Sequence, residues 1–315
     1  AAPLFAAATR RYVDAHFGPR PRSRFVALIG DAELDEGNVW EAVADPATTG
    51  LGNVMWLVDF NRQSLDRVVP GVRINQWRGQ FEAAGWHVVE VKYGRRLAAA
   101  YGRPGGAALR DWIDVMPNEQ YQSLFGLSGP ELRKRFLDGA PEAVAAFVAD
   151  IPDDELGPLV TDLGGHDLAA LLDAYAQCDA VTDRPSVVFA YTVKGWGLPI
   201  AGNPRNHSAL LTTEQIAALR AAHGLTPETE WDRLDPASPA GIGASSGLRS
   251  RMPCSARVPT GSRRYRAASS GSVHVRITNS VSRQSGSTGA ASTTGTADMA
   301  PPFPASHLPG EPRMP

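Results

Sequence analysis

Cysteine is scarce in this chain of 315 residues, and the only two, Cys178 and Cys254, exclude a framework of disulfide bonds. Apolar runs long enough to cross a membrane are absent, and the apolar stretch 1–8 is too short and lacks the basic leader of a signal peptide. These absences predict a protein of the reducing cytoplasm with no membrane partner. The hydrophobic content of 43% is sufficient for a real core.

A basic surface is also missing from most of the chain. The net charge of the whole sequence is −2, but residues 236–315 contain nine arginines, no lysine and two acids. That segment is therefore at +7, and residues 1–235 are at −9. An acidic body lacks the positive field that nucleic-acid binding requires, so we expect no nucleic-acid partner.

Residues 226–315 lack the apolar periodicity of helices and strands. Serine, glycine and proline supply 34 of the residues in 236–315, and such a composition buries too little apolar surface to offset chain entropy. We predict that 226–315 is disordered and that the folded domain is 1–225. The absence of lysine beside abundant arginine favours the hypothesis of a shifted reading frame, and a native basic tail that touches RNA or a membrane is the alternative.

Two short apolar runs, 25–29 and 54–58, are rich in β-branched residues, and a carboxylate follows each of them. Between them lies a segment of helical character, so the pattern predicts the order strand, turn, helix, strand. The two strands are expected to be buried and parallel. A right-handed crossover places the carboxyl ends of both strands at the same edge of the sheet. We therefore expect Asp31 and Asn61 to converge there.

A carboxylate and a carboxamide at one sheet edge suit a small divalent cation that carries phosphates. Mg²⁺ takes few protein ligands, prefers oxygen and fills its octahedron with phosphate oxygens and water. Asp31 and Asn61 would supply side-chain oxygens, Gln63 its backbone carbonyl, and Gly30 a close approach of the backbone to the phosphates. The alternative is that Gly30 and Asp31 form an ordinary turn and that Asn61 simply caps a strand.

The stretches GDAELDE (30–36) and DFNRQSLD (59–66) together resemble the thiamine diphosphate motif. The resemblance is strongest to the homodimeric decarboxylating subunit of pyruvate dehydrogenase, with transketolases as more distant relatives. FEAAGWHVVEVKYG, LGGHDLAALLDAY and PSVVFAYTVKGWG follow in the same order, and the resemblance is collinear over residues 1–225. Two departures are Ala32, where the motif has a second glycine, and Asp59, where those relatives have an asparagine.

The resemblance implies thiamine diphosphate and Mg²⁺ as cofactors and oxidative decarboxylation of pyruvate or another 2-oxo acid. It further implies acyl transfer to a lipoylated acyltransferase component and a homodimer in the full-length family. In that family, cofactor-binding histidines and an activating glutamate belong to segments that have no counterpart here, so we expect a fragment with incomplete turnover. The implied cofactor-binding residues are Gly30, Asp31, Ala32, Glu33, Asn61, Gln63 and Lys194, with Asp31, Asn61 and Gln63 as the metal ligands.

A second informative region is 164–211. The run 87–91 predicts a third strand, and the apolar run 187–193 predicts a fourth strand that ends in Lys194. The ammonium group of Lys194 can offset diphosphate charge, and a loop rich in glycine and proline follows. By resemblance, His207 occupies the position of a loop histidine that handles substrate or the acyl acceptor, and an imidazole can move protons at neutral pH. His166 before the helix 168–177 is a weaker candidate for site contact. Both histidines have a purely structural alternative.

Every predicted strand is a continuous apolar run separated from the next by sequence of helical length. This pattern predicts an α/β fold with a parallel sheet flanked by helices, the diphosphate half of a thiamine diphosphate fold. Residues 104–150 are expected to be a helical insertion. Three functions remain open: a 2-oxo acid dehydrogenase subunit, a transketolase-type enzyme that transfers two-carbon units between sugar phosphates, and a truncated, non-catalytic fragment.

Overall fold

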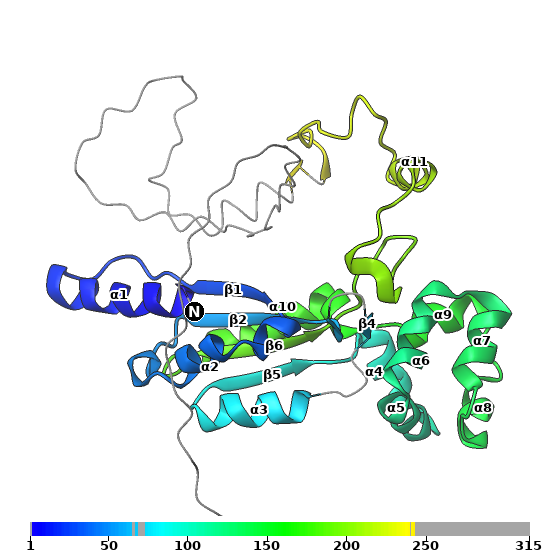
Figure 1. Ribbon diagram of the computed structural model, residues 1–315, viewed down its shortest axis with the longest axis horizontal. Coiled ribbons are helices and arrows are strands. Elements are labelled where there is room, and N and C mark those ends of the chain that lie inside the picture. The colour runs from blue at the N-terminus through cyan, green and yellow to red at the C-terminus, as the bar shows by residue number, and fades with distance from the viewer. Residues whose placement is uncertain (1, 65–66, 69–72, 240, 243–315) are drawn as a thin grey trace, which may run out of the picture. The chain divides into compact units, whose positions relative to one another are not determined.

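A parallel sheet of four strands organises the computed structural model, which describes residues 2–64, 67–68, 73–239 and 241–242. The strands are β1 (Phe25–Gly30), β2 (Val54–Phe60), β5 (His87–Val91) and β6 (Ser186–Tyr191), in the spatial order β1-β2-β6-β5 (Figure 1). Every neighbouring pair is parallel. The predicted parallel α/β fold is confirmed.

Helices cover both faces of this sheet, because alternate residues of each strand point to opposite sides. Val54, Trp56, Val58 and Phe60 of β2 belong to the core shared with α1 (Ala2–Phe17), α2 (Gly37–Ala44) and α3 (Ile74–Ala83). Met55 belongs instead to a second buried cluster on the other face, with Ala174 and Cys178 of α10 (Leu168–Ala180). Buried Cys178 thus behaves as a small apolar residue.

One strand is less buried than the sequence predicts. In the described part of the chain, β1 pairs only with β2 and is thus an edge strand, and α10 packs mainly against β5 and β6. On the face of α10, Val26 is therefore 46% exposed and Leu28 67% exposed. The prediction of two fully buried strands is right for β2 and wrong for β1, because an apolar run does not reveal which strand stands at the edge.

Six short helices between β5 and β6 gather at the end of the sheet toward which the strand arrows point (Figure 1). They pack through the same continuous core as the sheet. The sequence predicts α5, α7 and α8 and misses α4, α6 and α9. Their bounds are α4 (Arg95–Tyr101), α5 (Gly106–Val115), α6 (Asn118–Ser123), α7 (Gly129–Leu137), α8 (Glu142–Val148) and α9 (Asp153–Val160).

The remaining elements are short, apart from α11 (Thr213–Ala222), which a capping box at Thr212 begins. They are η1 (Asp31–Asp35), η2 (Pro46–Thr48), η3 (Leu124–Gly126), η4 (Gly164–His166), η5 (Pro204–His207) and the hairpin β3 (Gln63–Ser64) with β4 (Arg67–Val68). In the described part of the chain, no helix is both long and apolar enough to cross a bilayer. Residues 2–234 form one compact unit, and most of the predicted disordered tail lies outside the described residues.

Candidate functional site

The carboxyl ends of β1 and β2 bring the two predicted ligand side chains to one edge of the sheet. Gly30 lies opposite Asp59 in the strand register, so the residues that follow each strand are neighbours. Asp31 begins η1 and is 5% exposed. Its Oδ2 accepts a hydrogen bond of 2.7 Å from the backbone N–H of Arg62, the residue next to Asn61.

The electrostatic setting of Asp31 disfavours its negative charge. Burial raises the pKa of Asp31 to about 6, the nearby Asp59 carboxylate adds to this shift, and the N–H of Arg62 opposes it. A cation at this carboxylate would offset the cost of its burial, since an opposite charge favours the ionised form. The buried carboxylate therefore suits a positively charged ligand.

Asn61 and Gln63 turn the chain immediately after β2. Oδ1 of Asn61 accepts a bond of 3.0 Å from the backbone N–H of Gln63, and Nδ2 of Asn61 donates to Asp59 over 3.4 Å. The side chain of Gln63 donates to Gly202 O over 3.3 Å and to Oε1 of Gln122. Oε1 of Gln63 is buried without a hydrogen-bond partner, which is a costly state for an amide oxygen.

Gln122 on α6 is a site residue that sequence reasoning missed. Its Nε2 donates to Asn61 O over 3.1 Å and to Oδ1 of Asn118 over 3.2 Å, while its Oε1 accepts from Gln63. Gln122 is 1% exposed. The segment that contains Gln122 is polar and has no clean helical period, so the sequence gives no signal that Gln122 contacts the site. The only available signal is the row of amide residues on α6.

The start of η1 leaves open space where a phosphate could approach. A Cβ built on Gly30 would meet only Oε1 of Glu33, at 3.9 Å, and that oxygen accepts a 3.2 Å bond from the N–H of Gly30. Ala32 and Glu33 are exposed. Ala32 does not require a positive φ, because Arg62 is the only non-glycine residue with one in the described ranges.

Lys194 and His207 meet on the loop after β6. Lys194 Nζ lies 3.2 Å from Nδ1 of His207, which must accept because an ammonium group only donates. Asn206 fastens the loop by donating to Lys194 O over 3.2 Å and to Ile200 O over 2.6 Å. Gly195 is left-handed, with φ +74°, and a Cβ there would lie 2.0 Å from Asn206 Nδ2, so only glycine fits.

The link between this loop and the Asp31 edge is Gly202. Gly202 O accepts from the Gln63 side chain, and its N–H donates to Lys194 O over 3.0 Å. Among the described residues, no hydrogen bond joins Lys194 or His207 directly to Asp31 or Asn61. The structure therefore forms two neighbouring groups connected by the Gly202 backbone.

His166 has a structural contact in this region. Its ring stacks on Trp196 with centroids 4.7 Å apart and planes 11° apart, and its Nε2 accepts from Val193 N–H over 3.0 Å. Burial lowers the pKa of His166, which keeps the imidazole neutral and able to accept.

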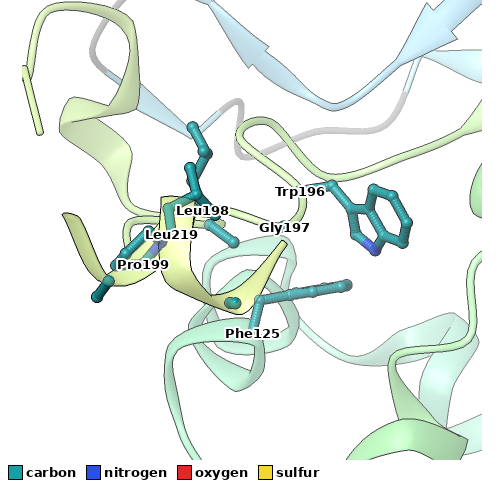
Figure 2. A pocket seen from close by; sticks show the side chains of 9 residues that line it. Phe125, Trp196, Gly197, Leu198, Pro199 and Leu219 are labelled. Atoms are coloured by element: carbon teal, nitrogen blue, oxygen red, sulfur yellow. The ribbon is translucent and has the colours of Figure 1, made fainter. Parts of the chain in front are cut away.

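The loop also borders an apolar pocket of about 540 Å³ against α11. Figure 2 shows Trp196 and Phe125 on one side of it and Leu198, Pro199 and Leu219 on the other. Within the described ranges, no group of three His, Cys, Asp or Glu side chains could hold a metal ion. A cation site at Asp31 would combine this carboxylate with amide and carbonyl oxygens.

Comparison with known proteins gives the family. The family model described as "Transketolase, thiamine diphosphate binding domain" matches residues 6–101 and 158–233. The unmatched residues between these segments contain α5 to α8, where the sequence predicts a helical insertion.

Curated relatives are longer than this chain. The pyruvate dehydrogenase E1 component of Escherichia coli K12 is 30% identical over 182 residues, which cover 57% of this chain and 20% of the relative. The same component of Corynebacterium glutamicum is 29% identical over 218 residues, 68% of this chain and 23% of the relative. The chain thus spans about a fifth to a quarter of the length of these relatives.

Solved transketolases resemble the chain more weakly. The transketolase of Leishmania mexicana has 19% sequence identity and a TM-score of 0.46, over 79% of this chain and 28% of that protein. The family match covers more than half of the sequence. The chain belongs to the transketolase family of thiamine diphosphate binding domains.

Proposed function

We propose that this chain binds thiamine diphosphate through Mg²⁺ and forms the diphosphate-binding half of a 2-oxo acid dehydrogenase. The observation that carries the proposal is the convergence of Asp31 and Asn61 at one sheet edge, beside the open approach at Gly30. Oxygen from one carboxylate, one carboxamide and one backbone carbonyl is a donor set that Mg²⁺ accepts together with phosphate oxygens.

The residues present fit these groups. Asp31 is a buried carboxylate whose charge is disfavoured without a cation, and Asn61 is a buried amide at the same edge. In the proposed site Asp31 and Asn61 hold the cation by their side chains and Gln63 by its carbonyl, with Gly30, Ala32 and Glu33 along the diphosphate. Bound thiamine diphosphate would supply the electron sink for decarboxylation.

Lys194 and His207 are the proposed groups on the substrate side. The ammonium group of Lys194 can offset diphosphate charge, and its Nζ lies 3.2 Å from Nδ1 of His207. An imidazole is suited to accept or return a proton during substrate handling or acyl transfer.

The reaction class rests on the relatives that the chain matches. These are pyruvate dehydrogenase E1 components at about 30% identity, which favours pyruvate or another 2-oxo acid and a lipoylated acyltransferase partner. A cytoplasmic homodimer is part of the same proposal. Transketolase-type transfer between sugar phosphates is the second candidate, because the matched family model is that of transketolases. A non-catalytic fragment is the third.

Titration calorimetry tests the shared site. We expect the chain to bind thiamine diphosphate only when Mg²⁺ is present, and Asp31→Asn to abolish this Mg²⁺-dependent binding, because an amide cannot replace the anionic ligand. Asp35→Asn is the matched control, since that exposed acid on η1 pairs with Arg73 over 2.9 Å outside the site. Equal binding without Mg²⁺, or full binding by Asp31→Asn, would contradict the ligand assignment.

Turnover assays separate the three functions. With both cofactors present, decarboxylation of pyruvate supports the dehydrogenase, and two-carbon transfer from a ketose phosphate to an aldose phosphate supports the transketolase. Cofactor binding without either reaction supports the non-catalytic fragment.

A further inference from the structure

Arg62 has a backbone conformation that arginine rarely adopts. Its φ is +62°, and it is the only non-glycine residue with a positive φ in the described part of the chain. The left-handed region is strained for an L-residue and is visited mainly by glycine, asparagine and aspartate. An arginine between the candidate ligands Asn61 and Gln63 must therefore be held there by other contacts.

The left-handed turn aims two successive backbone amides at the two candidate ligand side chains. The N–H of Arg62 donates to Oδ2 of Asp31 over 2.7 Å, and the N–H of Gln63 donates to Oδ1 of Asn61 over 3.0 Å. Each bond fixes the rotation of a side chain whose oxygen would face the cation. The conformation at Arg62 thus determines the geometry of both side chains at once.

The side chain of Arg62 provides the anchor for this turn. Its Cζ lies 5.4 Å from the ring centroid of Tyr121 on α6 and 5.8 Å from that of Tyr191 at the end of β6. Its Nη2 donates to Thr192 O over 3.3 Å. Arg62 is 8% exposed, so cation–π contacts with two buried rings are strong enough to favour one position of the residue.

We propose that Arg62 is a positioning residue for the metal site. Its guanidinium group, clamped between Tyr121 and Tyr191, holds the left-handed turn that orients Asp31 and Asn61. This inference deepens the proposed function and rests on the Mg²⁺ site described there. It assigns to Arg62 no contact with substrate or cofactor.

The alternative is that Arg62 only adds packing energy, and a pair of arginine variants distinguishes the two roles. Arg62→Met keeps an apolar stem but removes the charge and the planar group. Arg133→Met on α7 is the matched control, because Arg133 is also partly buried, donates to Val148 O over 2.9 Å and pairs with Asp153, remote from the site. Both variants lower the melting temperature if both arginines stabilise the fold.

Only a positioning role of Arg62 predicts a change in the binding constant of thiamine diphosphate. We expect Arg62→Met to weaken Mg²⁺-dependent binding of thiamine diphosphate by about 10- to 100-fold in calorimetry, as is typical when the partners of metal ligands are removed. Arg133→Met should leave the binding constant unchanged. Arg62→Gly should bind more tightly than Arg62→Met, because glycine reaches the left-handed region without strain. Wild-type affinity in Arg62→Met would overturn the proposal.

A second measurement keeps this test independent of the cofactor. Amide hydrogen exchange of the unliganded full chain should show faster exchange in segment 61–64 for Arg62→Met and not for Arg133→Met. If Arg62→Met fails to fold, Arg62→Gln, which keeps a polar planar end but loses the positive charge that the two rings attract, takes its place with the same expectations. If wild type binds no cofactor, the proposed function fails, and unchanged exchange in the Arg62 variant overturns the positioning role separately.

Discussion

At the scale of single residues, the side chain of Gln122 stabilises the turn after β2. It donates to Asn61 O and accepts from the side chain of Gln63, so it satisfies groups that no water can reach. We expect Gln122→Leu to lower the free energy of unfolding by about 1–3 kcal/mol, because its partners become buried and unpaired. Denaturant unfolding followed by circular dichroism measures this loss.

The control for Gln122 is Gln80→Leu, the same change at an exposed position of α3. It should leave the free energy of unfolding nearly unchanged. Equal stabilities of the two variants would show that the amide cluster is not a source of stability.

The sequence predicts the convergence of Asp31 and Asn61 better than it predicts their surroundings. Asp31 and Asn61 follow apolar runs, so topology alone brings them to one edge. The left-handed conformation of Arg62 and the contacts of Gln122 depend on α6, which lies far along the chain. No local pattern encodes such contacts.

At the scale of elements, helices with a local sequence signal are predictable, and helices that depend on distant contacts are not. α10 begins where Asp167 accepts from the N–H groups of Ala169 and Ala170, and aspartate is a residue type that sequence analysis recognises as a helix cap. α6 escapes prediction because its buried face includes Asn118, Gln120 and Gln122. A helix that buries amides has no apolar period to detect.

The cap of α10 makes stability depend on pH. Hydrogen bonds from Arg95, Ala169 and Ala170 lower the pKa of Asp167 from 3.8 to about 2. The folded state thus favours the carboxylate, and this stabilisation is complete above pH 4 and is lost as the pH falls toward 2. We expect Asp167→Asn to lose about 1 kcal/mol near neutral pH and to show less acid destabilisation than wild type.

Urea unfolding between neutral pH and pH 2 checks this expectation. Asp173→Asn, on an exposed turn of the same helix, is the control for loss of a charge on α10. A pH dependence of Asp167→Asn that parallels wild type over the whole range would refute the cap as its source.

At the scale of the whole compact unit, the faces of the sheet are unequally covered. α1, α2 and α3 bury one face with a continuous core, whereas α10 covers the half formed by β5 and β6 on the other. The apolar side chains of Val26 and Leu28 remain on the uncovered half, beside the free edge of β1. Exposed apolar groups on an edge strand favour association between molecules.

We therefore expect the isolated chain to self-associate through β1, and Leu28→Lys to shift sedimentation toward the monomer. Because Leu28 is 67% exposed, the lysine can reach water, and the melting temperature at low protein concentration should hardly change. Leu210→Lys is the control, since Leu210 is 91% exposed and lies on the loop before α11. The same added charge there should leave association intact, so an equal effect of both variants would point to net charge and not to the sheet edge.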